Sequence, residues 1–299
     1  TRGLFIQQCV ERRWTLVKGD VKKAFLQGRP FEEHLEKLIE PVPELCEALD
    51  MKEMEAVRLN KAAYGLAEAP LRWYQTCHEE FTKCGGRRLL SDECGWVFTT
   101  SSGEVYGAIV GHVDDFVMAG NASDPRWLTV MEALKNKWTF GSWETLTTTS
   151  PFTQCGVRWR LLPCGSITLD QQDYVRDQVR PVSLHPSRAS CRTAKVTEIE
   201  ARQIAACLGS LQWLVTQTAM RYLIDVNLLQ ARAKEATVQL IVELNTLVAR
   251  ISKTPDCVLT YRYIGEPVAI LGWSDAAWAN RADGGSTGGG LVTIGGISS

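Results

Sequence analysis

The sequence predicts a mixed α+β fold in which antiparallel strands and amphipathic helices occupy different stretches of the chain. Two apolar runs flank a short polar tip between residues 105 and 119, a pattern typical of a β-hairpin. Two more apolar runs with a strand pattern lie near the C-terminal end. Apolar residues recur at helical spacing in five segments, which are 66–83, 126–138, 170–180, 198–217 and 236–253.

The first predicted strand covers residues 14–19 and runs into Asp20, and a turn or helix start follows at 21–26. The helix predicted at 66–83 has Pro70 in its first turn, where a proline is tolerated. The glycines at 85 and 86 end it.

The acidic residues Glu198 and Glu200 favour a helix start at position 198, because carboxylates stabilise a helix N-terminus. Strands are predicted at 268–273 and 291–294, and the Gly/Ser/Thr-rich stretch 284–290 joins them.

The composition is that of an ordinary folded protein, with 45% hydrophobic and 22% charged residues among 299, so disordered and collagenous classes are excluded. No apolar run approaches the roughly 18 residues of a membrane span. The 10 cysteines form no C-x-x-C pair and the 4 histidines are scattered, which argues against a zinc site or a disulfide framework. We therefore expect reduced, mostly packing cysteines and an intracellular, reducing location.

The net charge of −1 conceals an uneven distribution along the chain. Residues 1–125 have 15 basic and 20 acidic side chains, and residues 126–265 have 17 and 11. An acidic first part is thus followed by a basic middle, which could be a solvated surface or could contact a phosphate backbone.

Three carboxylates lie at the ends of predicted strands. Asp20 closes the first strand, and Asp114 and Asp115 lie at the hairpin tip. If these elements converge, the carboxylates could hold two divalent cations, because Mg²⁺ prefers hard oxygen ligands. Spacing alone favours ordinary turn chemistry, for which aspartate is well suited.

Seven ordered blocks around these residues resemble the reverse transcriptase of copia-type long-terminal-repeat retrotransposons, running into the start of ribonuclease H. Residues 20–28 (DVKKAFLQG) resemble DVKTAFLNG, and residues 112–115 (HVDD) stand where the family has YVDD. The other blocks are 58–74 (RLNKAAYGLAEAPLRWY), 91–98 (SDECGWVF), 169–175 (LDQQDYV), 208–214 (LGSLQWL) and 272–279 (GWSDAAWA), the last followed by STGG at 286–289.

This resemblance implies RNA-directed DNA polymerase activity by two-metal nucleotidyl transfer onto a primer 3′-hydroxyl. It implies that Asp20, Asp114 and Asp115 are catalytic and bind Mg²⁺ or Mn²⁺, with the backbone carbonyl of Val21 as a further ligand. The implied partners are deoxynucleoside triphosphates and an RNA or DNA template with its primer, and no membrane. Location in a cytoplasmic virus-like particle or the nucleus would follow.

The resemblance also implies roles beyond the triad. Phe25 stands where such polymerases place an aromatic steric gate against the 2′-hydroxyl of the nucleotide. Tyr64, Gly65 and Pro70 are implied to lie beside the nucleotide, and His112 to contact the primer. Asp275 matches the first metal ligand of ribonuclease H. Packing alone would also explain an aromatic residue at position 25 or 64.

Several positions depart from the family pattern. His112 replaces a tyrosine, Ala277 replaces an aspartate, and Ala67 with Glu68 replaces a Lys-Gln pair. The added negative charge would cost on the order of 1–2 kcal/mol in polyanion binding if Glu68 lies close to it. Only 19 residues precede Asp20, so we expect most of the family's fingers to be missing.

We therefore predict three segments: a reverse-transcriptase palm of antiparallel strands and helices over 1–125, a helical thumb and connection over 126–265, and an incomplete ribonuclease H-like segment over 266–299. Three interpretations stay open. The chain is a polymerase fragment, or a catalytically inactive remnant or domesticated fragment that at most binds nucleic acid, or an unrelated metal-dependent hydrolase. Primer extension and the flanking genomic sequence would separate them.

Overall fold

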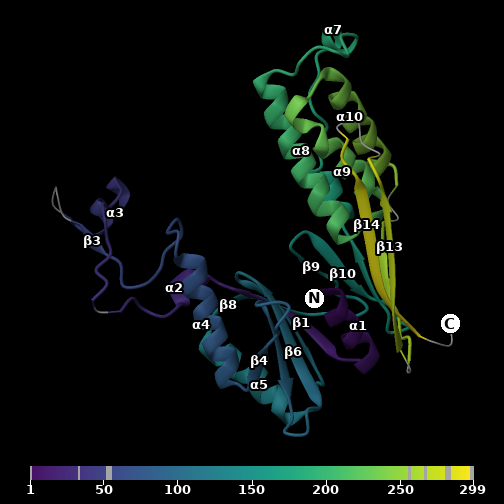
Figure 1. Cartoon of the computed structure of the whole chain (residues 1–299). Coiled ribbons are helices and arrows are strands. Elements are labelled where there is room, and N and C mark those ends of the chain that lie inside the picture. Colours follow the sequence, from purple (N-terminus) through teal and green to yellow (C-terminus); the bar gives the residue numbers. More distant parts are fainter. Residues whose placement is uncertain are drawn as a thin grey trace.

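A six-stranded antiparallel sheet organises the first half of the chain, in the order β4-β5-β6-β7-β1-β8 (Figure 1). The computed structural model describes residues 2–32, 34–51, 56–254, 257–265, 268–279 and 284–296. The strands of this sheet are β1 (Thr15–Val21), β4 (Gly86–Arg88), β5 (Gly95–Thr99), β6 (Val105–His112), β7 (Asp115–Gly120) and β8 (Phe140–Thr145). Because β8 pairs with β1, the sheet continues past residue 125.

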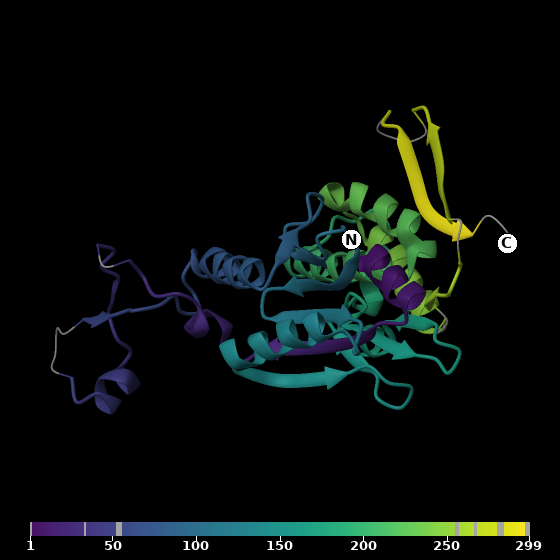
Figure 2. The same ribbon diagram turned by 90° about the horizontal axis from the view of Figure 1, so that it is seen from below.

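Helices cover both faces of this sheet. On one face α4 (Ala69–Lys83) and α5 (Pro125–Lys137) bury aromatic side chains such as Trp73, Phe81 and Trp127 against the strands. On the other face lies α1 (Arg2–Arg12), which buries Phe5, Ile6, Cys9 and Val10 at helical spacing. Figures 1 and 2 both place α1 on the side of the sheet away from α4 and α5.

An extended arm leaves the sheet after β1 and returns before α4. It contains α2 (Ala24–Gln27), β2 (Leu38–Ile39), α3 (Pro43–Ala48) and β3 (Val57–Arg58). β2 pairs with β3, and a bridge between Pro30 and Lys61 closes the base of the arm. In both Figure 1 and Figure 2 the β2–α3–β3 part stands away from the rest of the molecule.

A four-stranded antiparallel sheet in the order β12-β11-β10-β9 shares a core with α1 and the first sheet. Its strands are β9 (Phe152–Gln154), β10 (Val157–Leu161), β11 (Ile167–Asp170) and β12 (Leu259–Tyr261). Trp159, Ile167 and Leu169 contribute side chains that are almost completely buried.

Helices from the second half of the chain pack around a separate apolar core. They are α6 (Gln172–Gln178), α7 (Pro186–Ala189), α8 (Glu198–Gln217), α9 (Leu223–Ala231) and α10 (Val238–Ser252), with 3-10 turns at Met220–Tyr222 and Ala233–Glu235. A capping box explains where α8 begins, because the Thr197 hydroxyl accepts from the Glu200 backbone N–H while the Glu200 carboxylate accepts from that of Thr197.

A two-stranded hairpin follows, made of β13 (Val268–Ala277) and β14 (Thr287–Gly296). Among the described residues these two strands pair only with each other, and Figure 2 shows them projecting from the rest of the molecule. Residues 266–267, 280–283 and 297–299 of the third predicted segment lie outside the described residues.

The structure confirms a mixed α/β fold with antiparallel sheets, and helix α8 has the predicted bounds. The helix predicted from residue 66 begins at Ala69, because residues 66–68 form a turn in which the Ala69 N–H donates to the Leu66 carbonyl at 3.1 Å. The helix predicted at 170–180 is shorter, because Asp170 ends strand β11 and its carboxylate accepts from the Gln172 N–H. No described helix is long and apolar enough to cross a membrane.

Two glycines provide a matched test of how the sheet packs. A Cβ at Gly120 would lie 2.5 Å from the Trp127 ring, whereas one at Gly209, inside α8, would meet nothing within 4 Å. We expect Gly120→Ala to lower the free energy of unfolding by about 1–3 kcal/mol through overpacking. Gly209→Ala should raise it by roughly 0.5–1 kcal/mol because alanine favours helix. Urea unfolding measures both, and equal effects would contradict the packing of Trp127 on the sheet.

Candidate nucleotidyl-transfer site

The sheet register brings two of the predicted carboxylates face to face. Asp20, near the end of β1, lies directly opposite Asp115, the first residue of β7. Side chains opposite each other on antiparallel strands have Cβ atoms about 4.5–5.5 Å apart. Asp114 lies in the tight turn before β7, and its carbonyl accepts from the Val21 N–H at 2.9 Å. The three carboxylates and Val21 therefore converge at one end of the sheet.

The hairpin that carries Asp114 and Asp115 is tighter than predicted. β6 and β7 extend to His112 and Asp115, so the turn consists of Val113 and Asp114. Val113 has a φ of 57°, a left-handed conformation that costs a β-branched residue about 1–3 kcal/mol. Trp73 of α4 holds this turn by donating its indole N–H to the Val113 carbonyl at 2.6 Å. Helix packing thus fixes the strained turn that positions Asp114.

A second turn, between β9 and β10, also contacts Asp115. The Gln154 side-chain amide donates to the Asp115 backbone carbonyl at 3.3 Å, and the Cys155 backbone hydrogen-bonds to the Asp115 carboxyl group. Trp213 of α8 donates to the Cys155 carbonyl at 3.1 Å. Asp115 is therefore linked through this turn to the helices of the second half.

The environment of Asp115 raises the pKa of its carboxyl group to about 6. Burial is the largest cause, Lys18 opposes it, and the carboxylates of Asp20 and Asp114 raise the pKa further. Lys18 lies two residues before Asp20 on β1, so alternation places both side chains on the same face of the sheet. Lys18 also pairs with Glu144 at 3.6 Å.

Two features fit this place to a divalent cation. The Asp115 Oδ1 atom is buried and has no hydrogen-bond partner, and its neighbours Asp20 and Asp114 have hard carboxylate oxygens that could serve as further ligands. Among the described residues, no group of three or more His, Cys, Asp or Glu side chains is arranged so that it could hold a metal ion by itself. Magnesium characteristically binds one or two carboxylates together with substrate phosphates rather than a closed protein cage.

Two of the predicted nucleotide-side residues also come together. Phe25 of α2 packs on Tyr64, with ring centroids 4.7 Å apart, although the two are far apart in the sequence. Gly65 follows Tyr64 in a left-handed conformation, and Pro70 lies in the first turn of α4. Tyr64 is 59% exposed, so its ring presents an accessible surface beside Phe25.

Of the remaining predicted residues, His112 lies beside one of the carboxylates and Asp275 lies in a different sheet. His112 is exposed and lies across the hairpin from Asp115. Asp275 is on β13, in a sheet that the carboxylates do not share, and its side chain accepts from the Ala276 N–H. The structure thus brings Asp275 to no other member of the predicted site.

The charge of Glu68 is offset locally. Its carboxylate pairs with Lys37 at 2.8 Å and Arg72 at 2.9 Å, and hydrogen bonds from these two side chains lower its pKa. The electrostatic cost expected from replacing the family's Lys-Gln pair is therefore reduced.

Sequence reasoning missed Lys18, Trp73 and Cys155 as residues that shape the site. Lys18 could have been found, because period-two alternation places it beside Asp20. Trp73 was predicted only as part of an apolar helix face, and nothing local indicated that its N–H reaches the Val113 carbonyl. Cys155 lies in a turn that no strand prediction preceded.

The raised pKa of Asp115 predicts a specific pH dependence of stability. A carboxyl group whose pKa is higher in the folded state favours folding most at low pH, and this contribution is lost as pH rises from about 4 through about 6. Since the side chain is partly exposed, we expect roughly 1 kcal/mol. Urea unfolding of wild type and Asp115→Asn at pH 4 to 8 should show the variant gaining relative stability. A difference that does not change with pH would contradict the burial of Asp115.

Comparison with known proteins gives one family model and two relatives that span most of the chain. A family model described as reverse transcriptase (RNA-dependent DNA polymerase) matches residues 3–192, which include all three carboxylates. The chain is 26% identical over 302 residues to a retrovirus-related Pol polyprotein from transposon RE1 of Arabidopsis thaliana, covering 96% of this chain and 19% of that protein. A second one, from transposon RE2, is 25% identical over 286 residues, covering 92% and 18%. The chain therefore spans about a fifth of the length of these relatives.

Proposed function

The chain belongs to the reverse transcriptase (RNA-dependent DNA polymerase) family, and we propose that Asp20, Asp114 and Asp115 form the site at which it extends a primer. The observation that carries the proposal is the register of β1 with β7, which sets Asp115 opposite Asp20 beside the Asp114 turn. This arrangement lies within the region that matches the family.

The three carboxylates and the carbonyl of Val21 would hold Mg²⁺ or Mn²⁺. When bound, such ions lower the pKa of a primer 3′-hydroxyl and neutralise charge on the triphosphate. The protein's own contribution is to fix the ligands, through the Trp73 bond to Val113 and the Cys155 bond to Asp115. Because the pKa of Asp115 is about 6, its carboxylate form prevails above that pH and suits cation binding there.

We propose that the packed rings of Phe25 and Tyr64 form the wall against which a deoxynucleoside triphosphate sits, with Gly65 and Pro70 shaping the turn behind them. His112, exposed across the hairpin from Asp115, is placed to contact the primer end. These roles follow the family resemblance, and the contact between Phe25 and Tyr64 supports them.

The proposed division of the chain keeps a palm over 1–125, a thumb and connection over 126–265, and the opening of a ribonuclease H-like segment over 266–299, with Asp275 as its first metal ligand. Strand β8, at the start of the second segment, completes the palm sheet. For the third segment, the β13–β14 hairpin supports only the prediction of two strands.

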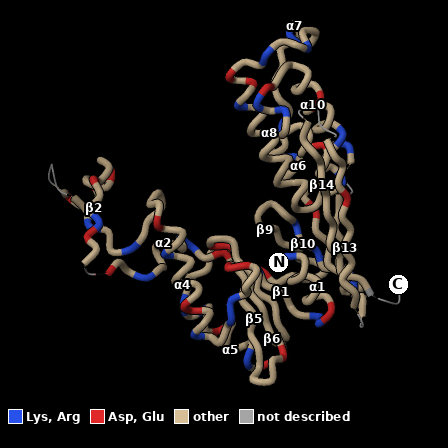
Figure 3. Tube along the Cα trace, in the orientation of Figure 1, with Lys and Arg blue, Asp and Glu red and all other residues tan. Residues whose placement is uncertain are grey.

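The basic middle segment is a candidate for contact with the template, and much of its charge is already paired. Lys and Arg positions recur around α7, α8 and α10, with acidic positions between them (Figure 3). Among the described residues of 126–265, the arginines that form ion pairs are Arg126, Arg158, Arg160, Arg176, Arg188, Arg232 and Arg250. We therefore expect primer-template binding to be moderate and to weaken as salt rises.

The test is primer extension by the purified chain on RNA templates of two different sequences. The proposal predicts products whose sequence follows each template. Salt-sensitive binding without extension would instead identify a fragment that only binds nucleic acid, and untemplated product would contradict the proposal.

A further inference from the structure

The carboxylate of Asp20 lies beside an irregularity in the six-stranded sheet. In the antiparallel pairing of β1 with β8, Asp20 faces Ser142. The next pair along the strands is Val21 with Phe140, so Gly141 is an extra residue without a partner on β1. This is the arrangement of a β-bulge, which bends a strand locally and re-aims the side chains beside it.

Gly141 leaves free the space beside the Asp20 carboxylate. A Cβ atom at position 141 would lie 3.1 Å from the Asp20 Oδ2 atom, closer than such atoms normally pack. Its other near neighbours, the Asp20 carbonyl and the Lys22 Cβ, would lie at 3.8 Å, which is an ordinary contact. The backbone of Gly141 is outside the left-handed region, so it suits alanine as well. Alanine would therefore fit here if the carboxylate moved by a few tenths of an ångström.

The side-chain amide of Gln27, the last residue of α2, fixes the backbone near this bulge. Its Nε2 group donates to the Lys22 carbonyl at 2.5 Å and to the Thr139 carbonyl at 2.8 Å. Its Oε1 atom accepts from the Thr139 N–H at 2.8 Å. Lys22 also donates its backbone N–H to the Thr139 carbonyl at 3.0 Å. These bonds tie the end of β1 to the start of β8.

The position of the Asp20 carboxylate depends on this packing more than that of Asp115 does. The Cys155 backbone hydrogen-bonds to the carboxyl group of Asp115. In the part of the chain that the structure describes, no hydrogen bond or ion pair holds the carboxylate of Asp20. Where its oxygens lie is therefore set by the space that its neighbours leave, and Gly141 bounds that space closely.

We propose that Gly141 and Gln27 are positioning residues, which together hold the bulge that aims the Asp20 carboxylate at a divalent cation. This inference rests on the proposed function, because Asp20 is a proposed metal ligand. Such support matters because the residues of a metal site must be held within about 0.5 Å of the productive geometry. Loss of the residues that orient metal ligands typically weakens metal binding roughly 10- to 100-fold.

The test is Mn²⁺ binding to the 299-residue chain, followed by the electron paramagnetic resonance signal of free Mn²⁺. A dideoxy-terminated primer on its template, with the matching nucleotide, gives the complete complex without chemistry. Binding by nucleotide and nucleic acid alone is subtracted. Wild type should bind the ion, and Asp20→Asn should lose most of that affinity. We expect Gly141→Ala to bind Mn²⁺ about tenfold more weakly, because the ligand oxygen is displaced.

Gly295→Ala is the matched control for this substitution. It makes the same change in β14, where the new Cβ would lie at an ordinary 3.7 Å from the Leu271 side chain. Its Mn²⁺ affinity should equal that of wild type. Urea unfolding distinguishes a positioning role from a merely structural one. A positioning role predicts that Gly141→Ala loses Mn²⁺ affinity while its stability stays close to that of wild type.

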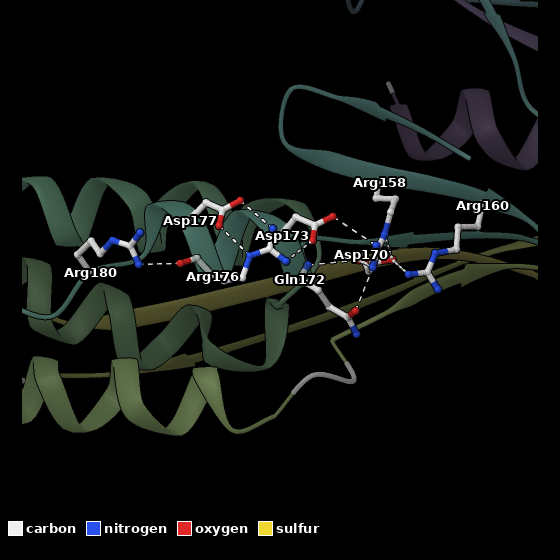
Figure 4. A network of polar contacts seen from close by, with 8 residues as sticks. All are labelled: Arg158, Arg160, Asp170, Gln172, Asp173, Arg176, Asp177 and Arg180. Atoms are coloured by element: carbon white, nitrogen blue, oxygen red, sulfur yellow. Dashed lines mark hydrogen bonds and ion pairs between the residues drawn. The ribbon is translucent and has the colours of Figure 1, made fainter. Parts of the chain in front are cut away.

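Gln27→Met removes the amide, keeps the length of the side chain, and should also weaken Mn²⁺ binding roughly tenfold. Gln172→Met makes the same change in the ion-pair network around Asp170, where the Gln172 Oε1 accepts from Arg158 at 3.0 Å (Figure 4). That variant should bind Mn²⁺ as wild type does. If Gln27→Met does not fold, Gly141→Ala decides.

The outcomes separate this inference from the proposed function. If Gly141→Ala binds Mn²⁺ as tightly as wild type while Asp20→Asn does not, the positioning role is wrong and the carboxylate site stands. An equal loss in Gly295→Ala would overturn the inference as well, because the effect would not be specific to the bulge. If wild type binds no more Mn²⁺ than Asp20→Asn does, the proposed site and this inference both fail.

Discussion

We expect Asp115→Asn to remove nearly all primer extension while the protein stays folded. The substitution keeps the shape of the side chain and removes the charge that a divalent cation requires. We expect the rate to fall by roughly 10³-fold or more, because metal stabilisation of developing charge is worth several kcal/mol. Single-turnover extension on an RNA template measures the loss, and circular dichroism verifies the fold.

Asp92→Asn is the matched control for this substitution. It makes the same chemical change in the loop before β5, where the Asp92 side chain accepts a hydrogen bond from the Cys94 N–H. Asparagine can still accept that bond, so extension should continue at the wild-type rate. If Asp92→Asn and Asp115→Asn lose extension rate equally, the carboxylates at the β1–β7 junction have no special role in extension.

We expect Phe25→Val to open the proposed nucleotide site to ribonucleotides. The Phe25 ring packs on Tyr64, and valine would leave space beside that ring for a 2′-hydroxyl. We expect discrimination between deoxyribonucleotides and ribonucleotides to fall by roughly 100-fold, as steric selection in a fitted pocket allows. Competition between the two nucleotide types in a single-nucleotide extension assay gives this ratio directly.

Tyr64→Phe keeps the ring that contacts Phe25 and loses only its hydroxyl, so selectivity should stay close to that of wild type. Unchanged selectivity in Phe25→Val, with deoxyribonucleotide use retained, would show that Phe25 is a packing residue and not a gate.

The parts of the fold that could be predicted are those whose signals are local. The hairpin of β6 and β7 follows from two apolar runs, and α8 follows from Glu198 and Glu200 at its start. Strands β9 to β12 were missed because each has only three to five residues and β11 pairs with β12 across about 90 positions of sequence. Helix α1 did carry a signal, with Phe5, Ile6, Cys9 and Val10 at helical spacing.

The candidate site shows the same limit. Local rules place Asp20, Asp114 and Asp115 at a strand end and a hairpin tip, but only the family resemblance singled them out as a candidate site. The Trp73 bond to Val113 and the Cys155 bond to Asp115 depend on packing between distant elements, so no local pattern indicates them. Residues 126–265 do contain more basic than acidic side chains. The sequence could not indicate which of these charges are paired, as Arg158 is with Asp170.

The most direct measurement is extension of a DNA primer on an RNA template by wild type and by Asp114→Ala, each with and without Mg²⁺. If the converging carboxylates are the site of nucleotidyl transfer, wild type yields template-directed product only with the metal, and Asp114→Ala yields none. Product that persists in Asp114→Ala would contradict the assignment of the three carboxylates.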